Sequence, residues 1–344
     1  MDKKKAIWAV AFVFIAGASI WAVMSQAKGF SIETFLEYIQ NSNPAWLCAA
    51  VISMLGYVVF EGLAIHSITS GLGHKRKVKS NFLYSAADIY FSAITPSATG
   101  GQPASAYFMM KDGIPTAVVT VSLLVNLVMY TAALLTTGLL CLIIAPGVFM
   151  NFSTLSRMLI IAGYILQIVL GAAFILLLFR GELLEKIFNK LFKLLDKLKI
   201  MNYRKKRQKK LQKTMEDFRE CANMISELKP MLGKAFAYNF LQRLSQILVT
   251  VFVFLATYGG SGKVKDIFVT QCFVVLGSNC VPIPGAMGVA DYLMLDGFGS
   301  IMSQIDATNL ELLSRSLSFY VLIIISGITV LVGYILRRIK RSKV

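Results

Sequence analysis

The sequence predicts an all-α polytopic membrane protein, with about six full transmembrane helices and two opposed re-entrant helical hairpins in an inverted repeat. Three observations lead to this fold class. Of the 344 residues, 56% are hydrophobic and only 15% are charged, and the mean hydropathy is +0.66. Soluble domains carry roughly 45–50% apolar and about 25% charged residues. The other two observations are long apolar runs and two stretches rich in proline and glycine between apolar arms.

Six apolar runs each reach roughly the 20 residues needed to cross the hydrocarbon core of a bilayer. They cover about 6–24, 45–70, 115–145, 157–180, 232–258 and 314–336. The first run follows a basic start, as in a signal peptide, but it is long for one and no small-residue cleavage site follows. We therefore expect a retained span. The third run is long enough to tilt or bend, and Pro146 is expected to end it.

Basic segments set the expected orientation of these spans. The formal net charge of +17 is explained by cytoplasmic loops rich in Lys and Arg, so no nucleic-acid partner is expected. The start "DKKK", the loop "HKRKVK" at 74–79 and the tail "RRIKRSK" all predict cytoplasmic positions. The segment 181–213 holds twelve Lys or Arg against three acids and is assigned to the same side. Both termini are therefore expected in the cytoplasm.

This alternation makes two segments return to the face from which they start. The segment 80–113 begins and ends on the cytoplasmic side, so it is predicted to form a re-entrant hairpin with "TPSATGGQP" at its tip. The segment 265–310 begins and ends outside, with "NCVPIPGAMGVADYLMLDG" at its middle. Both tips run from Pro through small residues to Tyr, apolar residues, Asp and Gly, which is typical of an inverted repeat. The alternative is that both are surface connections and the short likeness is chance.

Four units follow along the chain. Residues 1–43 form the first transmembrane helix and an outer loop, and 44–180 form the first repeat half. Residues 181–230 are a cytoplasmic, basic amphipathic segment, and 231–344 form the second repeat half. Within the third unit, 182–213 is expected to lie on the leaflet and to attract anionic lipids. Topological anchoring is the simpler interpretation of this segment, and a regulatory lipid-binding role is the other.

The hairpin tips are the first candidate site. Helix ends expose N–H groups with partial positive charge, and glycine lets a ligand approach the backbone closely. This suits a phosphate or another anion, and at this depth an anionic phospholipid headgroup is the natural candidate. The candidate residues at the first tip are Thr95, Ser97, Thr99, Gly100, Gly101 and Gln102. Those at the second tip are Pro282, Pro284, Gly285 and Gly288.

Polar residues inside the spans are the second candidate site, because ionisable groups at membrane depth are usually functional. In the run 232–258, polar residues recur at helical spacing and form one stripe. They include Asn239, Gln242, Arg243 and Gln246. Arg243 can bind a phosphate bidentately. Glu61, in the middle of 45–70, could contact an amine headgroup, and a structural ion pair between Glu61 and Arg243 is the alternative for both.

Asp88 and Asp291 flank the two tips. Each is a candidate to titrate or to bind a cationic group, and each could equally cap or brace its own hairpin. The sequence carries no nucleotide-binding loop or hydrolase signature, and its five cysteines and two histidines form no metal-ligand pattern. We therefore expect no catalytic residue, no metal and no cofactor.

The stretch "TPSATGGQP" at 95–103 and the motif "PIPGAMG" at 282–288 resemble the transmembrane domain of bacterial lysylphosphatidylglycerol synthase/flippase proteins, the multiple peptide resistance factors. The resemblance covers about 6–338. It implies a multi-pass protein of the bacterial plasma membrane that flips phosphatidylglycerol or lysyl-phosphatidylglycerol and blunts cationic peptides. In full-length members a cytosolic domain makes the lysyl lipid. The 344 residues leave no room for that domain, so the resemblance implies the flippase half, with a separate synthase as a candidate partner.

Other functions stay open at this point. One is an enzyme, which by inheritance of the family name is a phosphatidylglycerol lysyltransferase. An enzyme predicts acid and base residues gathered in one cavity, and the sequence shows no compelling cluster of that kind. Another is a transporter of polyprenyl phosphate or hopanoid lipids. A scaffold that only recruits a synthase is the last, and it predicts that changes at the hairpin tips leave function intact.

Overall fold

The computed structural model describes residues 40–95, 99–180, 182–183, 185–187, 190, 205–279, 286 and 288–342. Within these ranges the chain forms helices joined by short connections, without a strand, which confirms the all-α class. The predicted span at 6–24 lies outside the described residues. So do Ser97, Pro282, Pro284 and Gly285, and most of the amphipathic stripe at 182–199.

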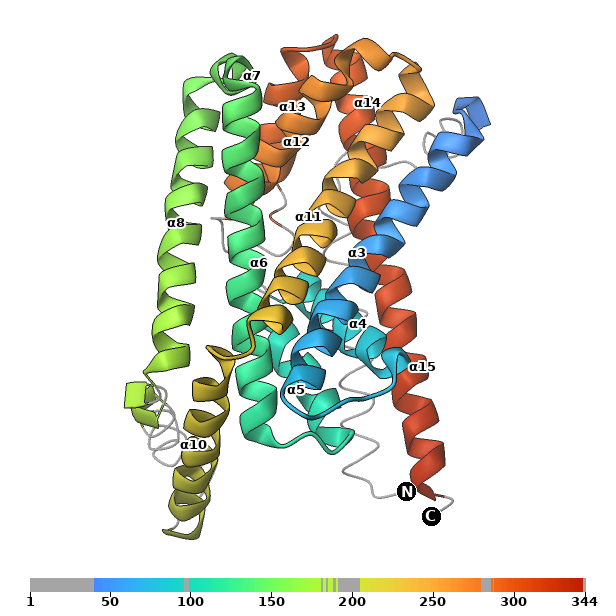
Figure 1. Ribbon diagram of the computed structural model, residues 1–344. Helices are drawn as coiled ribbons and strands as arrows, with labels where there is room; N and C mark the ends of the chain where they lie inside the picture. Colours follow the sequence, from blue (N-terminus) through green and yellow to red (C-terminus); the bar gives the residue numbers. More distant parts are fainter. Residues whose placement is uncertain are drawn as a thin grey trace.

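Five of the described helices are long and apolar enough to cross a membrane, which confirms a polytopic membrane protein. They are α3 (Pro44–Gly71), α6 (Thr116–Ile144), α8 (Thr154–Phe179), α11 (Lys229–Tyr258) and the continuous segment Gln304–Arg337. The first four match the predicted runs to within three residues at each end. Figure 1 shows them as a bundle, in which α3 and α11 cross the molecule packed against one another.

Local sequence explains where these helices start and stop. The Asn43 side chain accepts a hydrogen bond of 2.9 Å from the Ala45 N–H, and Pro44 occupies the first turn of α3, where its missing N–H costs nothing. Helix α6 ends at Ile144, before Pro146 begins the short helix α7 (Pro146–Asn151), as the sequence predicts. Helix α11 ends at Tyr258 and is capped by Gly259, whose φ of +62° is the left-handed conformation that glycine adopts without strain.

Two pairs of shorter helices lie at opposite ends of the bundle (Figure 1). Helix α4 (Val78–Ile94) packs against α5 (Gly101–Lys111), and α12 (Val264–Ser278) packs against α13 (Val289–Gly299). In both pairs the break between the helices falls at the stretch rich in proline and glycine, since neither residue type favours a helix interior. The helix–break–helix form expected for the two hairpins is therefore present, and their depth in a bilayer stays a prediction.

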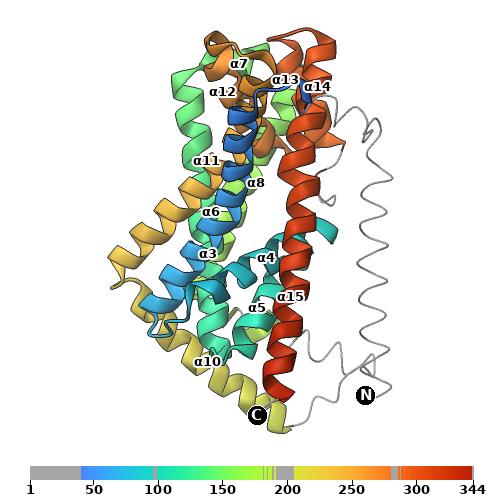
Figure 2. The ribbon, with the colours of Figure 1, turned by 90° about the vertical axis from the view of Figure 1, so that its right-hand side faces the viewer.

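The second hairpin is shorter than 265–310. Helix α13 ends at Gly299, and α14 (Gln304–Arg315) continues through the π-helical η4 (Ser316–Val321) into α15 (Leu322–Ser342). Figure 2 shows this segment as one long column. The boundary differs because the first turns of that column are polar and charged, so an apolar run begins only near 314. π-Helical turns within longer helices are frequent at functional sites.

Helix α10 (Lys205–Ile225) lies within the segment 181–230 and packs at the end of α6 and α8 (Figure 1). Its apolar side is buried in the protein, through Met215, Phe218, Ala222 and Ile225. The segment 181–230 is thus not only a surface strip, because part of it packs against the bundle.

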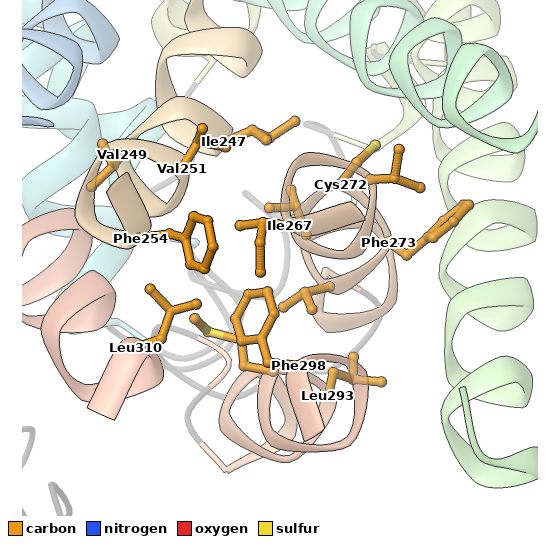
Figure 3. Close-up of a cluster of buried hydrophobic side chains, with 14 of the residues drawn as sticks. Ile247, Val249, Val251, Phe254, Ile267, Cys272, Phe273, Leu293, Phe298 and Leu310 are labelled. Atoms are coloured by element: carbon orange, nitrogen blue, oxygen red, sulfur yellow. The ribbon is translucent and has the colours of Figure 1, made fainter. Parts of the chain in front are cut away.

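Side chains from several helices of the second repeat half fill the core around the second hairpin. Ile247 and Phe254 of α11 meet Ile267 of α12 and Phe298 of α13 (Figure 3). Leu310 of α14 closes the same cluster. Between membrane helices, association depends on close van der Waals packing rather than on escape from water. The hairpin is therefore positioned by shape complementarity with α11 and α14.

Gly163 lets α8 approach the backbone of α12 closely. A Cβ added there overlaps the carbonyl oxygen of Leu276 and comes within 2.9 Å of its carbonyl carbon, so backbone would have to move. We expect Gly163→Ala to destabilise the protein by about 1–3 kcal/mol, the usual cost of overpacking. Thermal unfolding in detergent checks this. Gly233→Ala is the matched control, because nothing lies within 4 Å of that position; equal melting temperatures for the two variants would contradict the packing seen here.

Candidate functional site

A buried polar cluster lies where α3, α4, α5, α6 and α11 meet. Its members are buried or partly buried and contact one another through side-chain hydrogen bonds or ring contacts. They are Tyr57, Glu61, Ser85, Asp88, Gln102, Asn126, Tyr130, Asn239, Gln242, Arg243 and Gln246. The stripe expected along 232–258 faces this cluster, and the first hairpin reaches it through Asp88 and Gln102.

Arg243 is the central cation of the cluster and is only 1% exposed. Its guanidinium lies between two aromatic rings, with its carbon 5.0 Å from the centre of Tyr57 and 4.3 Å from the centre of Tyr130. The Nη1 group donates to Gln246 Oε1 at 2.7 Å and to the Tyr130 hydroxyl at 3.3 Å. These contacts hold a flat cation in place by cation–π attraction.

The Tyr57 hydroxyl also lies within hydrogen-bond range of Arg243, but two nitrogens of the guanidinium make no hydrogen bond with the described residues. Nε and Nη2 are buried and have no hydrogen-bond partner in the part of the chain that the structure describes. No carboxylate of that part forms an ion pair with Arg243 within 4.0 Å. An unsatisfied buried donor costs about 1–3 kcal/mol, and more when it is charged. The guanidinium therefore presents a pair of adjacent N–H groups, the arrangement that fits a carboxylate or phosphate.

Glu61 and Asp88 form an acidic pair beside this cation. Their side chains are 5% and 6% exposed, and the two carboxyl groups lie within hydrogen-bond range of each other. Oε2 of Glu61 accepts hydrogen bonds of 3.2 Å from Ser85 Oγ and from Gln242 Nε2. The direct ion pair between Glu61 and Arg243 that the sequence left open is not formed; Glu61 is instead bonded to neutral donors.

The first hairpin is attached to the acidic pair through both of its helices. Asp88 belongs to α4, and its Oδ2 accepts a 2.7 Å hydrogen bond from Gln102 Nε2 in the first turn of α5. Ser92 Oγ donates to Oδ1 of Asp88 at 3.1 Å. Asp88 therefore braces its hairpin and also belongs to the central cluster, while its role in titrating or binding a cationic group stays a prediction.

Packing at the first tip leaves no room for a side chain at Gly100 or Gly101. A Cβ on Gly101 overlaps the Asp88 carboxylate and comes within 2.6 Å of the Asp88 carbonyl oxygen. A Cβ on Gly100 comes within 2.7 Å of the Thr95 methyl group. The Thr95 hydroxyl accepts the Gly100 N–H at 2.9 Å, which closes the turn, and Thr99 is exposed. These glycines let α5 start against α4, and the expected role of admitting a ligand to the backbone stays a prediction.

Asp291 lies in a separate charged group at the second hairpin. It caps α13, where its Oδ2 accepts the N–H of Gly288, whose φ is +80°, at 2.8 Å. Oδ1 of Asp291 is 3.0 Å from Nε of Arg315, and the buried Glu311 lies within hydrogen-bond range of Asp291. Among the described residues no hydrogen bond or ion pair joins this group to Arg243. Through these contacts Asp291 braces the second hairpin.

Sequence reasoning missed part of both groups. Asn126 and Tyr130 of α6 face the stripe of α11, and Asn126 Oδ1 accepts a 3.0 Å hydrogen bond from Asn239. Their spacing of four residues in an otherwise apolar run was the available signal. Glu311 and Arg315 share the same spacing in α14, at the start of the last apolar run.

The cluster is closed in this conformation, because protein covers Arg243 and both acids. An open pocket of about 370 Å³ lies elsewhere, lined by Phe254, Tyr258, Gly260, Gly262, Lys263, Met302 and Asp306. It contains none of the candidate residues, so volume alone does not locate the site. Within the described ranges no three His, Cys, Asp or Glu side chains gather in a way that could hold a metal ion.

A charged contact fixes the first hairpin to the last helix. Nε of Arg337 donates to Oδ1 of Asp112 at 2.8 Å, and Nη2 of Arg337 donates to Oδ2. The Tyr84 hydroxyl also donates to Oδ2, at 2.6 Å. Burial raises the pKa of Asp112, but the hydrogen bonds from Arg337 and Tyr84 outweigh it, so the pKa is held below its ordinary value.

This contact gives a pH-dependent stability. Because the folded-state pKa is lowered, the stabilisation is complete above the ordinary pKa of about 3.9 and is lost as pH falls through the lowered value. We expect Asp112→Asn to cost about 1–2 kcal/mol at pH 7 and the difference from wild type to shrink near pH 3. Thermal unfolding at both pH values measures it, with the exposed Asp217→Asn as control. An equal gap at both pH values would contradict this assignment.

Fold and cluster together define a polytopic membrane protein that encloses a buried charged site between its spans. Residues 7–326 match the family described as "Lysylphosphatidylglycerol synthase TM region", and the chain belongs to that family. The membership confirms the resemblance seen at the two tips and indicates a membrane lipid-related function. Comparisons with curated proteins and with solved structures gave no match.

Proposed function

We propose that this protein is a lipid translocase that passes phospholipid headgroups, such as those of phosphatidylglycerol or lysyl-phosphatidylglycerol, between the leaflets of a membrane. The observation that carries the proposal is the pair of unused donors on Arg243, buried between spans and free of a carboxylate partner. A phosphate diester offers two acceptor oxygens, which match two adjacent N–H groups of a guanidinium. Family membership supplies the connection to membrane lipids.

The two hairpins supply a route by which a closed site can open to either face. They lie at opposite ends of the bundle and each is broken at its tip (Figure 1). In transporters built from inverted repeats, broken helices meet near the midplane, and rocking of one repeat against the other exposes the site alternately. We expect movement of the first hairpin, which carries Asp88 and Gln102, to open the cluster toward the face from which that hairpin enters.

In the cell this protein would lie in a bacterial plasma membrane with both termini in the cytoplasm. The basic segment 182–213 would contact anionic lipids there. Outward movement of a lysyl lipid would lower the negative charge of the outer surface and so blunt cationic peptides. A separate synthase would then be the source of the lysyl lipid.

The orientation of the hairpins is open to a direct test by labelling. We expect cysteines placed at Lys75 and Lys265, in a background without other cysteines, to react with an impermeant thiol reagent from opposite faces of intact cells. Both positions are exposed, one just before α4 and the other at the start of α12. Labelling of both from the same face would rule out hairpins that enter from opposite sides.

An enzyme is the second candidate, because the structure brings Glu61 and Asp88 together although they are far apart in sequence. A membrane transferase, such as a phosphatidylglycerol lysyltransferase, needs an acid and a base near a lipid phosphate or hydroxyl. The enzyme would leave a new product, whereas the translocase leaves each lipid chemically unchanged.

The deciding experiment is reconstitution of the purified protein in vesicles. Fluorescent phosphatidylglycerol, lysyl-phosphatidylglycerol and a polyprenyl phosphate are compared for leaflet exchange, and the lipids are extracted for mass spectrometry after incubation with and without lysyl-tRNA. We expect exchange of at least one lipid and no new lipid species. A lysylated product would favour the enzyme, and the absence of both exchange and product, with folded protein in the vesicles, would leave the scaffold.

A further inference from the structure

We propose that Glu61 and Asp88 form a proton-binding pair, and that binding of a lipid phosphate at Arg243 is coupled to the uptake of a proton by this pair. The inference rests on the proposed function and names the ion that would move with the lipid. It begins from geometry: Glu61 of α3 and Asp88 of α4 are both buried, and Ser85, one turn before Asp88 on α4, donates to Glu61 Oε2 at 3.2 Å, so the two carboxyl groups lie close together. Two buried carboxyl groups this close do not both ionise, so the pair holds one proton.

The charges that face the pair come from each packed helix. Tyr57 faces it from α3 and Arg243 from α11, and Tyr130 of α6 contacts Arg243. Helix α5 contributes the neutral Gln102, and α15, which also packs against α4, has its Arg337 engaged by Asp112 at the far end. Among these groups the single permanent cation is Arg243. With one proton on the pair, the remaining carboxylate balances that cation and the cluster is neutral.

Arrival of a phosphate changes this balance. A phosphodiester adds one negative charge to a site that protein shields from water, and an unbalanced charge at low dielectric is costly. A second proton on the pair restores neutrality. By linkage, a lipid that favours protonation is itself bound more tightly when protons are abundant, so both ligands assist each other. The loaded site then carries a proton and a lipid anion together without net charge.

The pair is also connected to the moving part. Gln102 Nε2 donates to Asp88 Oδ2 at 2.7 Å, which links the two arms of the first hairpin. A hydrogen bond to an ionised carboxylate is roughly twice as strong as one to a neutral group. Full protonation therefore weakens the bond between α4 and α5 when lipid is bound, and deprotonation strengthens it after release. The protonation state of Glu61 and Asp88 thus changes how strongly α4 and α5 are joined in the first hairpin.

The test counts protons in two ways. Calorimetric titration of the protein with short-chain phosphatidylglycerol, in buffers of different ionisation enthalpy, gives the number of protons taken up on binding. Vesicles with a pH difference and fluorescent phosphatidylglycerol give net lipid redistribution. We expect uptake of about one proton per lipid and redistribution toward the less acidic side, as linkage requires. Glu61→Gln and Asp88→Asn should lose proton uptake and the response to the gradient, whereas the exposed Glu216→Gln on α10 should keep both.

The outcomes separate this inference from the translocase itself. Exchange that depends on Arg243 but ignores the pH difference, with no proton taken up on binding, would overturn the coupling and leave the translocase standing. Binding with proton uptake but without exchange in vesicles would support the linked site and overturn the translocase. Unchanged proton uptake in both Glu61→Gln and Asp88→Asn would overturn the assignment of the proton to this pair, whatever the transport result.

Discussion

Replacement of Arg243 by alanine is expected to lower the rate of lipid exchange by about 100-fold or more. Truncation of one partner in a buried charged hydrogen bond costs about 2–5 kcal/mol, and each 1.4 kcal/mol is a factor of about ten. In wild type the unused Nε and Nη2 groups are the donors that would receive the phosphate. Lysine keeps the charge but offers no planar pair of N–H groups, so Arg243→Lys is expected to recover only part of the rate.

The comparison needs a control for the loss of a cation from α11. Lys234 is exposed on the same helix, and Lys234→Ala is expected to exchange lipid at the wild-type rate. Gel filtration and circular dichroism show whether each variant is folded, because Arg243 also packs against Tyr57 and Tyr130. Wild-type exchange by folded Arg243→Ala would remove this residue from the site.

Replacement of Gly101 by valine is expected to abolish exchange through the first hairpin. Any side chain at this position overlaps the Asp88 carboxylate, so α5 must move away and the bond from Gln102 to Asp88 breaks. Overpacking of this kind costs about 1–3 kcal/mol of stability. The rate of lipid exchange should fall further than this loss of stability explains, because the movement of α5 also takes Gln102 away from Asp88.

Gly147→Val is the matched substitution for this experiment. Nothing lies within 4 Å of Gly147, so a side chain there meets open space. It should leave exchange and melting temperature close to wild type. If folded Gly101→Val also exchanges lipid at the wild-type rate, the first hairpin is not part of the transport path, as the scaffold hypothesis predicts.

The spans and the hairpin breaks could be predicted because each depends on local sequence. Length and hydropathy locate helices such as α6 and α8, and prolines such as Pro146 mark their ends. The polar stripe of α11 could also be predicted, since helical periodicity puts Asn239 and Arg243 on one face. Periodicity does not show which helices pack against that face.

The rest of the cluster depends on how separate helices meet. The bond between Gln242 and Glu61 joins residues 181 positions apart, and the bond between Asn239 and Asn126 joins residues 113 apart. No local pattern encodes such pairs. The start of the last span was missed for a different reason: α14 carries Asp306, Glu311 and Arg315, so hydropathy assigned its first turns to the hairpin. A charged stretch that packs against the second hairpin looks like a polar connection in sequence.

The most direct test of this account measures contact between Arg243 and a lipid phosphate. Solid-state NMR can detect dipolar coupling between ¹⁵N-labelled arginine side chains and the ³¹P nucleus of phosphatidylglycerol in reconstituted membranes. We predict a guanidinium signal that loses intensity through ³¹P coupling in wild type and Lys234→Ala, and that is absent in folded Arg243→Lys. The same ³¹P-coupled signal in Arg243→Lys would contradict the claim that this buried guanidinium receives the headgroup.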